Sequence, residues 1–349
     1  MPGLVRAAEG FSEGTAPEVT VLVPAFNVEK YLPMTLAGLQ AQDFGGWVCH
    51  ILDDGSTDGT LAVAEGFAAR DGRITVAHQA NRGVSAAWNR LLEDIQTPFV
   101  MMLDSDDLIH PHLFAYALAL AKEHQADIVE FTNDRVPEAF SPAEFPPFPE
   151  APRVTVSRDL SCYQTRSCAH GQWINKCNKL YRSEAIAGLR FDPELTYEED
   201  FWFNVLAHAR SRCKVVVNHC LYYYRTTPRS LTQRINYPRY VASGIRRIAL
   251  SHQFFIEEGR LLPAYREAYA CDITRDAFRM ILQKNLKRNP CLRESRALFA
   301  QAAEALAEFL RRGAIFPERL PKRRQRWALA LCIRRHYWLC RAMIYLSAI

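Results

Sequence analysis

Three acidic residues and a serine follow an apolar run in the segment PFVMMLDSDD, residues 98–107. The apolar run predicts a buried strand that would deliver Asp104, Ser105, Asp106 and Asp107 into solvent, where unpaired carboxylates repel. A divalent cation would remove this repulsion and could bridge to diphosphate oxygens, because hard cations prefer oxygen ligands. The alternative is that these acids only cap the next helix. A second acidic turn nearby favours the cation site.

The second acidic turn lies in LDDGSTDGTLAVAE, residues 52–65. Counted from Asp54, its acids, Gly59 and Glu65 come close to the spacing of an EF-hand calcium loop. Such a loop must follow a helix, but only WVCHILD separates Gly46 from Asp54, and this stretch is short and apolar, as in a central strand. The segment TLAVAEGFAAR that follows has helical spacing. We therefore predict a strand, an acidic turn and a helix, and we reject the calcium loop.

A third acidic group, YEED at residues 197–200, precedes the aromatic run FWFNVLA. Glu198, Glu199 and Asp200 at the start of a helix would interact favourably with the helix dipole, which needs no further function. The functional interpretation is that one carboxylate faces a cleft as a general base, with its proton affinity raised by the neighbouring acids. The residues alone leave both interpretations open.

Strands and helices alternate around these acids. Strands are predicted over 19–26, 47–53, 73–79, 98–103 and 126–133, and helices over 29–40, 60–70, 85–95 and 112–125. This alternation indicates an α/β fold with a mostly parallel central sheet, in which ligands bind beyond the carboxyl ends of the strands. That is where Asp53, Asp54, Asn81 and the acids of residues 104–107 fall. The proline-rich stretch 137–152 is either a connector or a wall of an acceptor groove.

The chain of 349 residues exceeds one ordinary domain, and its 49% apolar and 23% charged residues are typical of a soluble globular protein. We expect a loose N-terminus over 1–16, one domain over 17–236 and a helical region over 237–349. No signal peptide or membrane span is predicted, and the ten scattered cysteines fit a reducing cytoplasm. Nothing points to a nucleic-acid partner.

The C-terminal tail combines arginines with aromatic residues. Between Arg311 and Arg341 there are ten Lys/Arg residues against one acid, Glu318. The tail either packs on the protein, forms a contact between copies of the chain, or binds the anionic lipids at the inner face of the cytoplasmic membrane. All three remain open from the sequence.

Five segments occur together in a recognisable order: VTVLVPAFNVEKYL, ILDDGSTDGT, NRGVSAAWN, MMLDSDD and YEEDFWF. Together they resemble the family 2 glycosyltransferases that build bacterial surface polysaccharides, over Val19 to Arg234. The resemblance implies the A-type glycosyltransferase fold, a nucleotide-sugar donor (most often a UDP-sugar) and a Mn²⁺ or Mg²⁺ ion. It also implies inverting transfer of one sugar to a hydroxyl of a glycan or lipid-linked acceptor.

The resemblance also assigns roles at the start of the donor site. Pro24, Phe26 and Asn27 would line the pocket for the base and ribose. Asp53, helped by Asp54, would accept a hydrogen bond from the uracil imide.

The remaining donor and catalytic positions follow in the same way. Asn81 and Gly83 would form the other wall, and Asp104, beside Ser105, would touch the ribose side. Asp106 would hold the metal against the diphosphate.

The acceptor side depends on the third acidic group. Asp200 would be the general base and Glu199 would orient the acceptor. A nucleotidyltransferase would need a glycine-rich loop after the first strand, which VPAFNVEKYL lacks. A degenerate, non-catalytic nucleotide-sugar-binding or scaffold protein is the remaining alternative, and the intact acids favour an enzyme.

Two positions depart from the family or are ambiguous. Trp88 stands where many relatives have an arginine in N-x-G-x-S-x-A-R-N, so a cation near the donor is missing unless Trp88 is simply core. In LYYYRTTPRSLT, Tyr224, Arg225 and Ser230 either close over the diphosphate or belong to an edge strand with an exposed arginine.

Overall fold

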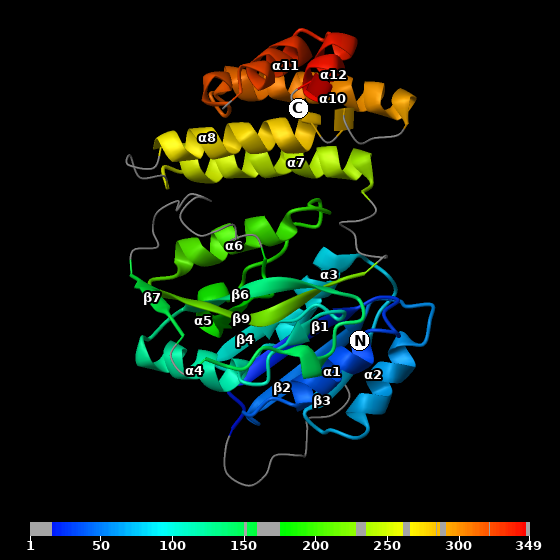
Figure 1. Ribbon diagram of the computed structural model, residues 1–349, viewed down its shortest axis with the longest axis vertical. Coiled ribbons are helices and arrows are strands. Elements are labelled where there is room, and N and C mark those ends of the chain that lie inside the picture. The colour runs from blue at the N-terminus through cyan, green and yellow to red at the C-terminus, as the bar shows by residue number, and fades with distance from the viewer. Residues whose placement is uncertain are drawn as a thin grey trace. The chain divides into compact units, whose positions relative to one another are not determined.

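The computed structural model describes residues 16–149, 152–158, 175–227, 235–260, 266–283, 285–286, 291–320 and 322–346 (Figure 1). The expected loose N-terminus, apart from Ala16, and Ser230 lie outside these residues. The chain forms two compact units. The first, here called the sheet unit, comprises Met1–Ser161, Asn175–Phe191 and Phe203–Ser230; the second, the helical unit, comprises Cys162–Ile174, Asp192–Trp202 and Leu231–Ile349.

Four parallel strands form the first half of the sheet, in the order β3-β2-β1-β4. Their bounds are Val19–Ala25 (β1), Trp47–Asp53 (β2), Ile74–His78 (β3) and Phe99–Met102 (β4). The connecting helices are Leu32–Gln40 (α1), Thr60–Ala68 (α2) and Val84–Leu91 (α3), the last extended by a 3₁₀ turn over Leu92–Asp94. The α/β alternation predicted from the sequence is confirmed.

The second half of the sheet is mixed. Its elements are Leu108–Ile109 (β5), Leu113–Glu123 (α4), Ile128–Pro137 (β6), Val154–Ser157 (β7), Lys179–Arg182 (β8), Ser183–Ile186 (α5), Glu199–Arg210 (α6) and Lys214–Thr226 (β9). Strand β8 lies antiparallel between β4 and β6, and β9 pairs parallel with β6 and antiparallel with β5 and β7. The interpretation of β9 as an edge strand is therefore wrong.

Both faces of the sheet are buried, which explains why its strands are continuously apolar. Val19, Val21 and Val23 face a core shared with α1 and α4. Leu22 faces a second core that includes α3. Trp88 lies in this second core with no exposed surface, stacked at 6.0 Å on Phe191. This confirms the interpretation of Trp88 as a core residue.

The proline-rich stretch packs on the sheet unit over its described residues. It contains one 3₁₀ turn, Pro142–Glu144, capped by Ser141. Phe145 stacks on Tyr223 of β9 at 4.6 Å, and Phe148 meets Tyr116 of α4 edge-on at 5.0 Å. The stretch is thus anchored by its aromatic residues; whether it also borders an acceptor stays a prediction.

Helices make up the described part of the chain from Tyr237 onward, as the periodicity predicts. They are Tyr237–His252 (α7), Arg266–Asp276 (α8), Leu292–Arg311 (α10), Arg323–Ile333 (α11) and Tyr337–Leu346 (α12), with π-helical turns at Gln253–Glu257 and Ala277–Gln283 and a 3₁₀ turn at Pro317–Arg319. In Figure 1, α7 and α8 run alongside each other, and Ala277–Gln283 continues α8 against α7.

None of the described helices combines the length and apolarity that crossing a bilayer requires. In the tail, Trp327 and Trp338 are 55% and 56% exposed, while Tyr337 packs edge-on against Phe299 of α10 at 5.2 Å. One face of the tail therefore packs within the helical unit. Membrane contact and oligomerisation stay predictions.

Candidate functional site

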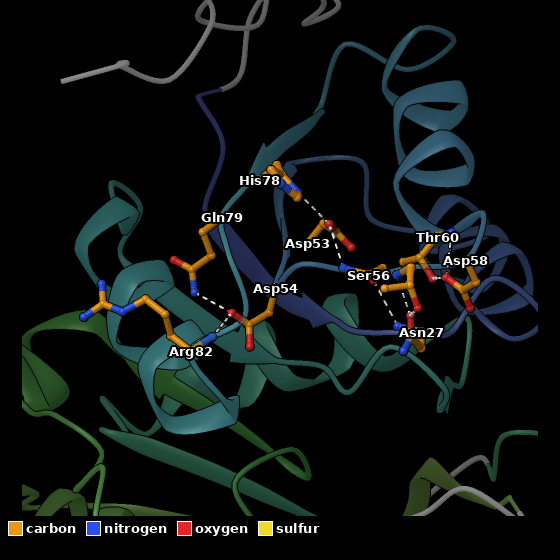
Figure 2. Close-up of polar contacts among 10 residues, drawn as sticks. Asn27, Asp53, Asp54, Ser56, Asp58, Thr60, His78, Gln79 and Arg82 are labelled. Atoms are coloured by element: carbon orange, nitrogen blue, oxygen red, sulfur yellow. Dashed lines mark hydrogen bonds and ion pairs between the residues drawn. The ribbon is translucent and has the colours of Figure 1, made fainter.

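The turn after β2 carries a buried carboxylate, Asp53, with hydrogen-bond partners on only one of its two oxygens within the described residues. Asp53 has no exposed surface, and its Oδ2 accepts from the backbone N–H of Ser56 (3.3 Å) and lies 2.7 Å from Nδ1 of His78, at the end of β3 (Figure 2). Its Oδ1 is also buried, and no described residue hydrogen-bonds to it. Buried polar atoms are nearly always satisfied, so this oxygen is suited to accept from an N–H donor on a ligand.

Asp54 has a different task. Its Oδ1 accepts from Nε2 of Gln79 (2.7 Å) and from the backbone N–H of Arg82 (3.0 Å) (Figure 2). Its Oδ2 accepts from the backbone N–H of Gly83 (2.9 Å). These bonds fix the loop that leads into α3. Asp54 therefore shapes the site from within, and its predicted contact with the base stays a prediction.

The same bonds explain why the calcium loop fails. Asp54 already accepts three hydrogen bonds from protein donors, and Oδ1 of Asp58 accepts from the backbone N–H of Thr60 at the start of α2 (3.0 Å). A strand, not a helix, precedes the turn. The EF-hand spacing is a coincidence of the strand–turn–helix sequence.

The turns after β1 and β2 are tied together. The backbone N–H of Asn27 donates to Oγ of Ser56 (2.9 Å), and Oδ1 of Asn27 accepts from the backbone N–H of Thr57 (2.8 Å). Asn27 has a left-handed backbone (φ 53°), which asparagine tolerates better than most residues. Phe26, beside it, is 47% exposed and can offer its ring to a planar ligand. Pro24 is half-buried in β1, opposite Leu52.

Two glycines in these loops have a positive φ, and at one of them, Gly55, the loops approach closely. Gly55 has φ 77°, and a Cβ there would lie 2.6 Å from the backbone nitrogen of Asn81. Gly83 has φ 87° at the start of α3. Asn81 and Gly83 are both exposed, on the same loop that Asp54 fixes. The structure thus brings the predicted residues of the first, second and third strand ends to one edge of the sheet.

The acidic turn after β4 is braced by neighbours that the sequence did not indicate. Oδ2 of Asp104 accepts from Sγ of Cys177 (3.0 Å), and its Oδ1 lies 3.3 Å from Nζ of Lys176. The side chain of Lys176 is only 5% exposed, and its Nζ lies 5.0 Å from the centre of the Trp88 ring. A cation is therefore present beside the position where many relatives carry arginine, but it comes from another segment.

The next two acids in the turn differ in their surroundings. Asp107 is fully buried; its Oδ2 accepts from the Tyr222 hydroxyl (2.5 Å) and its Oδ1 from the backbone N–H of Arg225 (2.8 Å). Burial, and then Asp106 and Asp104, raise the pKa of Asp107 well above its ordinary value. Burial and the charge of Asp104 raise the pKa of Asp106 to about 6. Ser105 is buried, and its carbonyl accepts from Oγ1 of Thr35 (3.1 Å).

These acids could hold a cation together with the phosphates of a ligand, but they do not form a site that surrounds a metal with protein ligands alone. Within the described residues, no group of three or more His, Cys, Asp or Glu side chains is arranged to hold a metal. Magnesium usually binds through one or two carboxylates and completes its shell with water and phosphate oxygens. Asp106, whose ionised form is disfavoured in this structure, would gain from such a cation.

Arg225 is a buried cation opposite this acidic turn. Its side chain is 2% exposed, its Nη2 contacts Sδ of Met34 (3.0 Å), and its Nε is buried with no hydrogen-bond partner among the described residues. Burial lowers its pKa, which Asp106 and Asp107 oppose. The interpretation of Arg225 as exposed is therefore wrong. A buried guanidinium with unused donors is suited to an anionic oxygen. The neighbouring Tyr224 is half-buried under the guanidinium of Arg135, 5.5 Å away.

The third acidic group begins α6 and belongs to the helical unit. Glu199 and Asp200 occupy the first turn of α6, as predicted, which suits the helix dipole. Glu198 precedes them with a left-handed backbone (φ 63°), and its carboxylate lies between Arg279 (3.2 Å) and Arg247 (3.5 Å). The catalytic roles of Glu199 and Asp200 stay predictions.

Several of these partners were missed from the sequence. His78 could have been found, because it stands at the carboxyl end of a predicted strand beside Asp53. Lys176, Tyr222 and the two arginines around Glu198 carry no local signal. They reach the acids only through long-range packing.

Comparisons with known proteins identify the family and the fold. The model of the family described as Glycosyl transferase family 2 matches residues 20–192. EpsH of Bacillus subtilis is 30% identical over 264 residues, which cover 72% of this chain and 72% of EpsH. EpsJ of the same organism, an uncharacterized glycosyltransferase, is 30% identical over 62% of this chain, and this match spans 63% of EpsJ.

TarS of Staphylococcus aureus, a poly(ribitol-phosphate) beta-N-acetylglucosaminyltransferase, is 28% identical over 59% of this chain and 35% of TarS. The crystal structure of TarS 1–349 in complex with UDP-GlcNAc matches with a TM-score of 0.69 and 21% identity, covering 95% of this chain and 91% of that chain. The fold is therefore shared over nearly the whole chain, including the C-terminal helices.

Proposed function

Since the chain belongs to glycosyl transferase family 2, we propose that it moves one sugar from a UDP-sugar to a hydroxyl of a glycan or lipid-linked acceptor in bacterial surface polysaccharide synthesis. The observation that carries the donor proposal is the buried Oδ1 of Asp53, which has no hydrogen-bond partner among the described residues. The donor named in a structure of TarS, UDP-GlcNAc, supports the uridine nucleotide. A lipid-linked acceptor would bring the enzyme to the inner face of the cytoplasmic membrane.

Asp53 selects the base in this proposal. The N3–H of uracil would donate to Oδ1 of Asp53, while His78 and Ser56 hold the carboxylate in place through Oδ2. Cytosine presents an acceptor at N3 and would leave the buried oxygen unsatisfied, which costs about 1–3 kcal/mol. The exposed ring of Phe26 would cover one face of the base.

Asp106, through a bound metal ion, and Arg225 would bind the diphosphate of the donor. Mn²⁺ or Mg²⁺ held by Asp106 would neutralise the leaving UDP. The buried guanidinium of Arg225 has an unused donor and would bind a phosphate oxygen. Lys176 compensates the charge of Asp104, so that the ribose-side carboxylate does not repel the diphosphate.

Asp200 is the proposed base, with Glu199 orienting the acceptor. The carboxylate would take the proton of the acceptor hydroxyl as the hydroxyl attacks in line with the leaving UDP. This attack inverts the anomeric centre and needs no covalent intermediate.

The test is calorimetric titration of UDP with Mn²⁺, of UDP without Mn²⁺, and of GDP with Mn²⁺. We expect heat from UDP that depends on Mn²⁺ and none from GDP. Binding of GDP alone would overturn the uridine assignment. A protein that binds UDP-GlcNAc but whose Asp200→Asn variant releases UDP as fast as wild type would overturn the role of Asp200. Wild-type binding without any transfer would instead favour a non-catalytic nucleotide-sugar-binding protein.

A further inference from the structure

The segment that carries Glu199 and Asp200 is attached to α7 by hydrogen bonds within the helical unit. Oγ of Ser243, which is fully buried, accepts from the backbone N–H of Thr196 (3.1 Å) and of Tyr197 (3.3 Å). The Tyr197 ring also packs edge-on against Tyr240 at 5.2 Å. Tyr240, Ser243 and Arg247 are spaced at i, i+3 and i+7, so one face of α7 makes all these contacts.

Glu198 is the strained residue of this segment. Its φ of 63° is left-handed, a conformation that costs free energy for a residue with a Cβ and persists only where the surroundings enforce it. Its carbonyl accepts from the backbone N–H of Trp202 (3.3 Å), the first hydrogen bond of α6. The conformation of Glu198 therefore sets the direction in which Glu199 and Asp200 leave the turn.

Two arginines hold the Glu198 carboxylate. Its Oε1 lies 3.2 Å from Nη2 of Arg279, and its Oε2 lies 3.5 Å from Nε of Arg247. Arg247 is 1% exposed and also pairs with Asp276 (3.0 Å), which in turn lies 3.5 Å from Arg279. Among the described residues, two cations and two anions thus form one cluster, and removal of one member changes its charge balance. The guanidinium of Arg247 lies 4.7 Å from the centre of the Phe201 ring, in the first turn of α6.

We infer that Glu198, Arg247 and Arg279 are positioning residues: the C-terminal helices hold the strained turn at Glu198 and thereby fix the proposed base Asp200. The inference rests on the proposed function of Asp200. It gives the helical unit a part in the transfer step itself, separate from any role on a membrane or between copies of the chain.

The decisive variant is Arg279→Gln, which removes one cation from Glu198 and leaves Arg247 in place. Arg275→Gln is the matched control, because Arg275 lies one helical turn earlier and pairs with Asp272 instead. We expect Arg279→Gln to slow UDP release from UDP-GlcNAc about tenfold or more, since small displacements of a catalytic group cost this much. The Kd for UDP should stay within about twofold of wild type. Arg279→Lys, which keeps the charge, should recover part of the rate.

Hydrogen exchange gives a second readout that needs no sugar donor. Amides of peptides covering residues 196–204 should exchange faster in Arg279→Gln than in Arg275→Gln. Equal exchange and equal UDP release in these two variants would overturn the inference. A purely structural ion pair would lower the melting temperature of Arg279→Gln but would not lower its kcat relative to the control. If Arg279→Gln does not fold, Glu198→Gln provides the same comparison with less change in volume.

Asp200→Asn separates this inference from the proposed function. If Asp200→Asn releases UDP at the wild-type rate, the assignment of the base is wrong. If Asp200→Asn abolishes release while Arg279→Gln equals its control, only the positioning role is wrong.

Discussion

Nδ1 of His78 lies 2.7 Å from Oδ2 of Asp53, the buried carboxylate whose Oδ1 meets no hydrogen-bond partner within the described part of the chain. The imidazole and the backbone of Ser56 thus occupy one oxygen and fix the direction of the other. A single oriented acceptor at the end of β2 is the simplest basis for reading the edge of a base.

Exchange of Asp53 for Asn should weaken uridine and UDP binding to the same degree. The lost bond is one between an N–H and a charged acceptor, worth about 1.5–3 kcal/mol, or about 10–150-fold in Kd. Calorimetry with both ligands measures it. Loss of UDP affinity with uridine binding intact would place Asp53 at the diphosphate and contradict its assignment.

Exchange of Arg225 for Gln should have the complementary effect. Its guanidinium is proposed to meet a phosphate oxygen, so the affinity for UDP should fall about tenfold while the affinity for uridine stays unchanged. The backbone N–H of Arg225 would still hold Asp107, so the acidic turn should survive the exchange. Arg135→Gln, which removes an exposed guanidinium from the Tyr224 ring, is the control.

Lys176→Met tests the cation beside Asp104. Removal of a buried ammonium 3.3 Å from a carboxylate makes the site more negative. UDP alone should then bind more weakly, and Mn²⁺ should raise the affinity for UDP by a larger factor than in wild type. The ratio of UDP affinities with and without Mn²⁺ is the quantity to compare. An unchanged ratio would show that Lys176 only packs on Trp88.

Gly55→Ala should destabilise the sheet unit. The new Cβ would meet the backbone nitrogen of Asn81 at 2.6 Å, and φ at this position is 77°. We expect a loss of about 2 kcal/mol or more in the free energy of unfolding, measured by chemical denaturation. Gly66→Ala is the control: Gly66 lies inside α2 with open space around its Cβ position, so this exchange should gain up to about 1 kcal/mol.

His208 should make the protein sensitive to acid. Its Nδ1 donates to the carbonyl of Asn204 (2.7 Å), and burial, followed by the charge of Lys214, lowers its pKa to about 3; Glu130 opposes this and Lys179 adds to it. The folded protein therefore keeps His208 neutral, while the unfolded chain binds a proton below about pH 6.5. Stability should fall as the pH falls below this value, by about 2 kcal/mol at pH 5.

The variant His208→Asn isolates this contribution, because its side-chain amide can replace Nδ1 as a donor. Its free energy of unfolding should change less between pH 6.5 and 5 than that of wild type. The free energy of unfolding is measured by urea denaturation at each pH. If it changes with pH equally in His208→Asn and wild type, the acid sensitivity belongs to other groups.

The sequence predicts the edge of the sheet formed by the ends of β1, β2, β3 and β4 well, because its signals are local. Apolar runs define β1, β2 and β4, and the acids that follow β2 and β4 fall at the carboxyl ends of parallel strands, where geometry brings them together. These features need no knowledge of distant partners. The residue type of Trp88 favours the core only slightly, and its burial in the structure decides the question.

Other features depend on pairings that periodicity does not contain. Strand β9 reads as exposed in isolation, but pairing with β5, β6 and β7 buries it together with Arg225. The bond between Asp107 and Tyr222 joins residues 115 positions apart. Likewise, the spacing of YEED cannot reveal that arginines 247 and 279 hold its first glutamate.

The bonds between Asn27 and the turn at Ser56 and Thr57 have a thermodynamic consequence. Both turns that flank Asp53 are ordered by the protein's own hydrogen bonds, and the left-handed backbone of Asn27 is part of that order. The conformational entropy of these two turns is therefore lost when the chain folds, and little would remain to be lost on binding of the proposed nucleotide. If a base binds at these turns as proposed, its affinity should reflect the contacts it makes rather than the ordering of a loop.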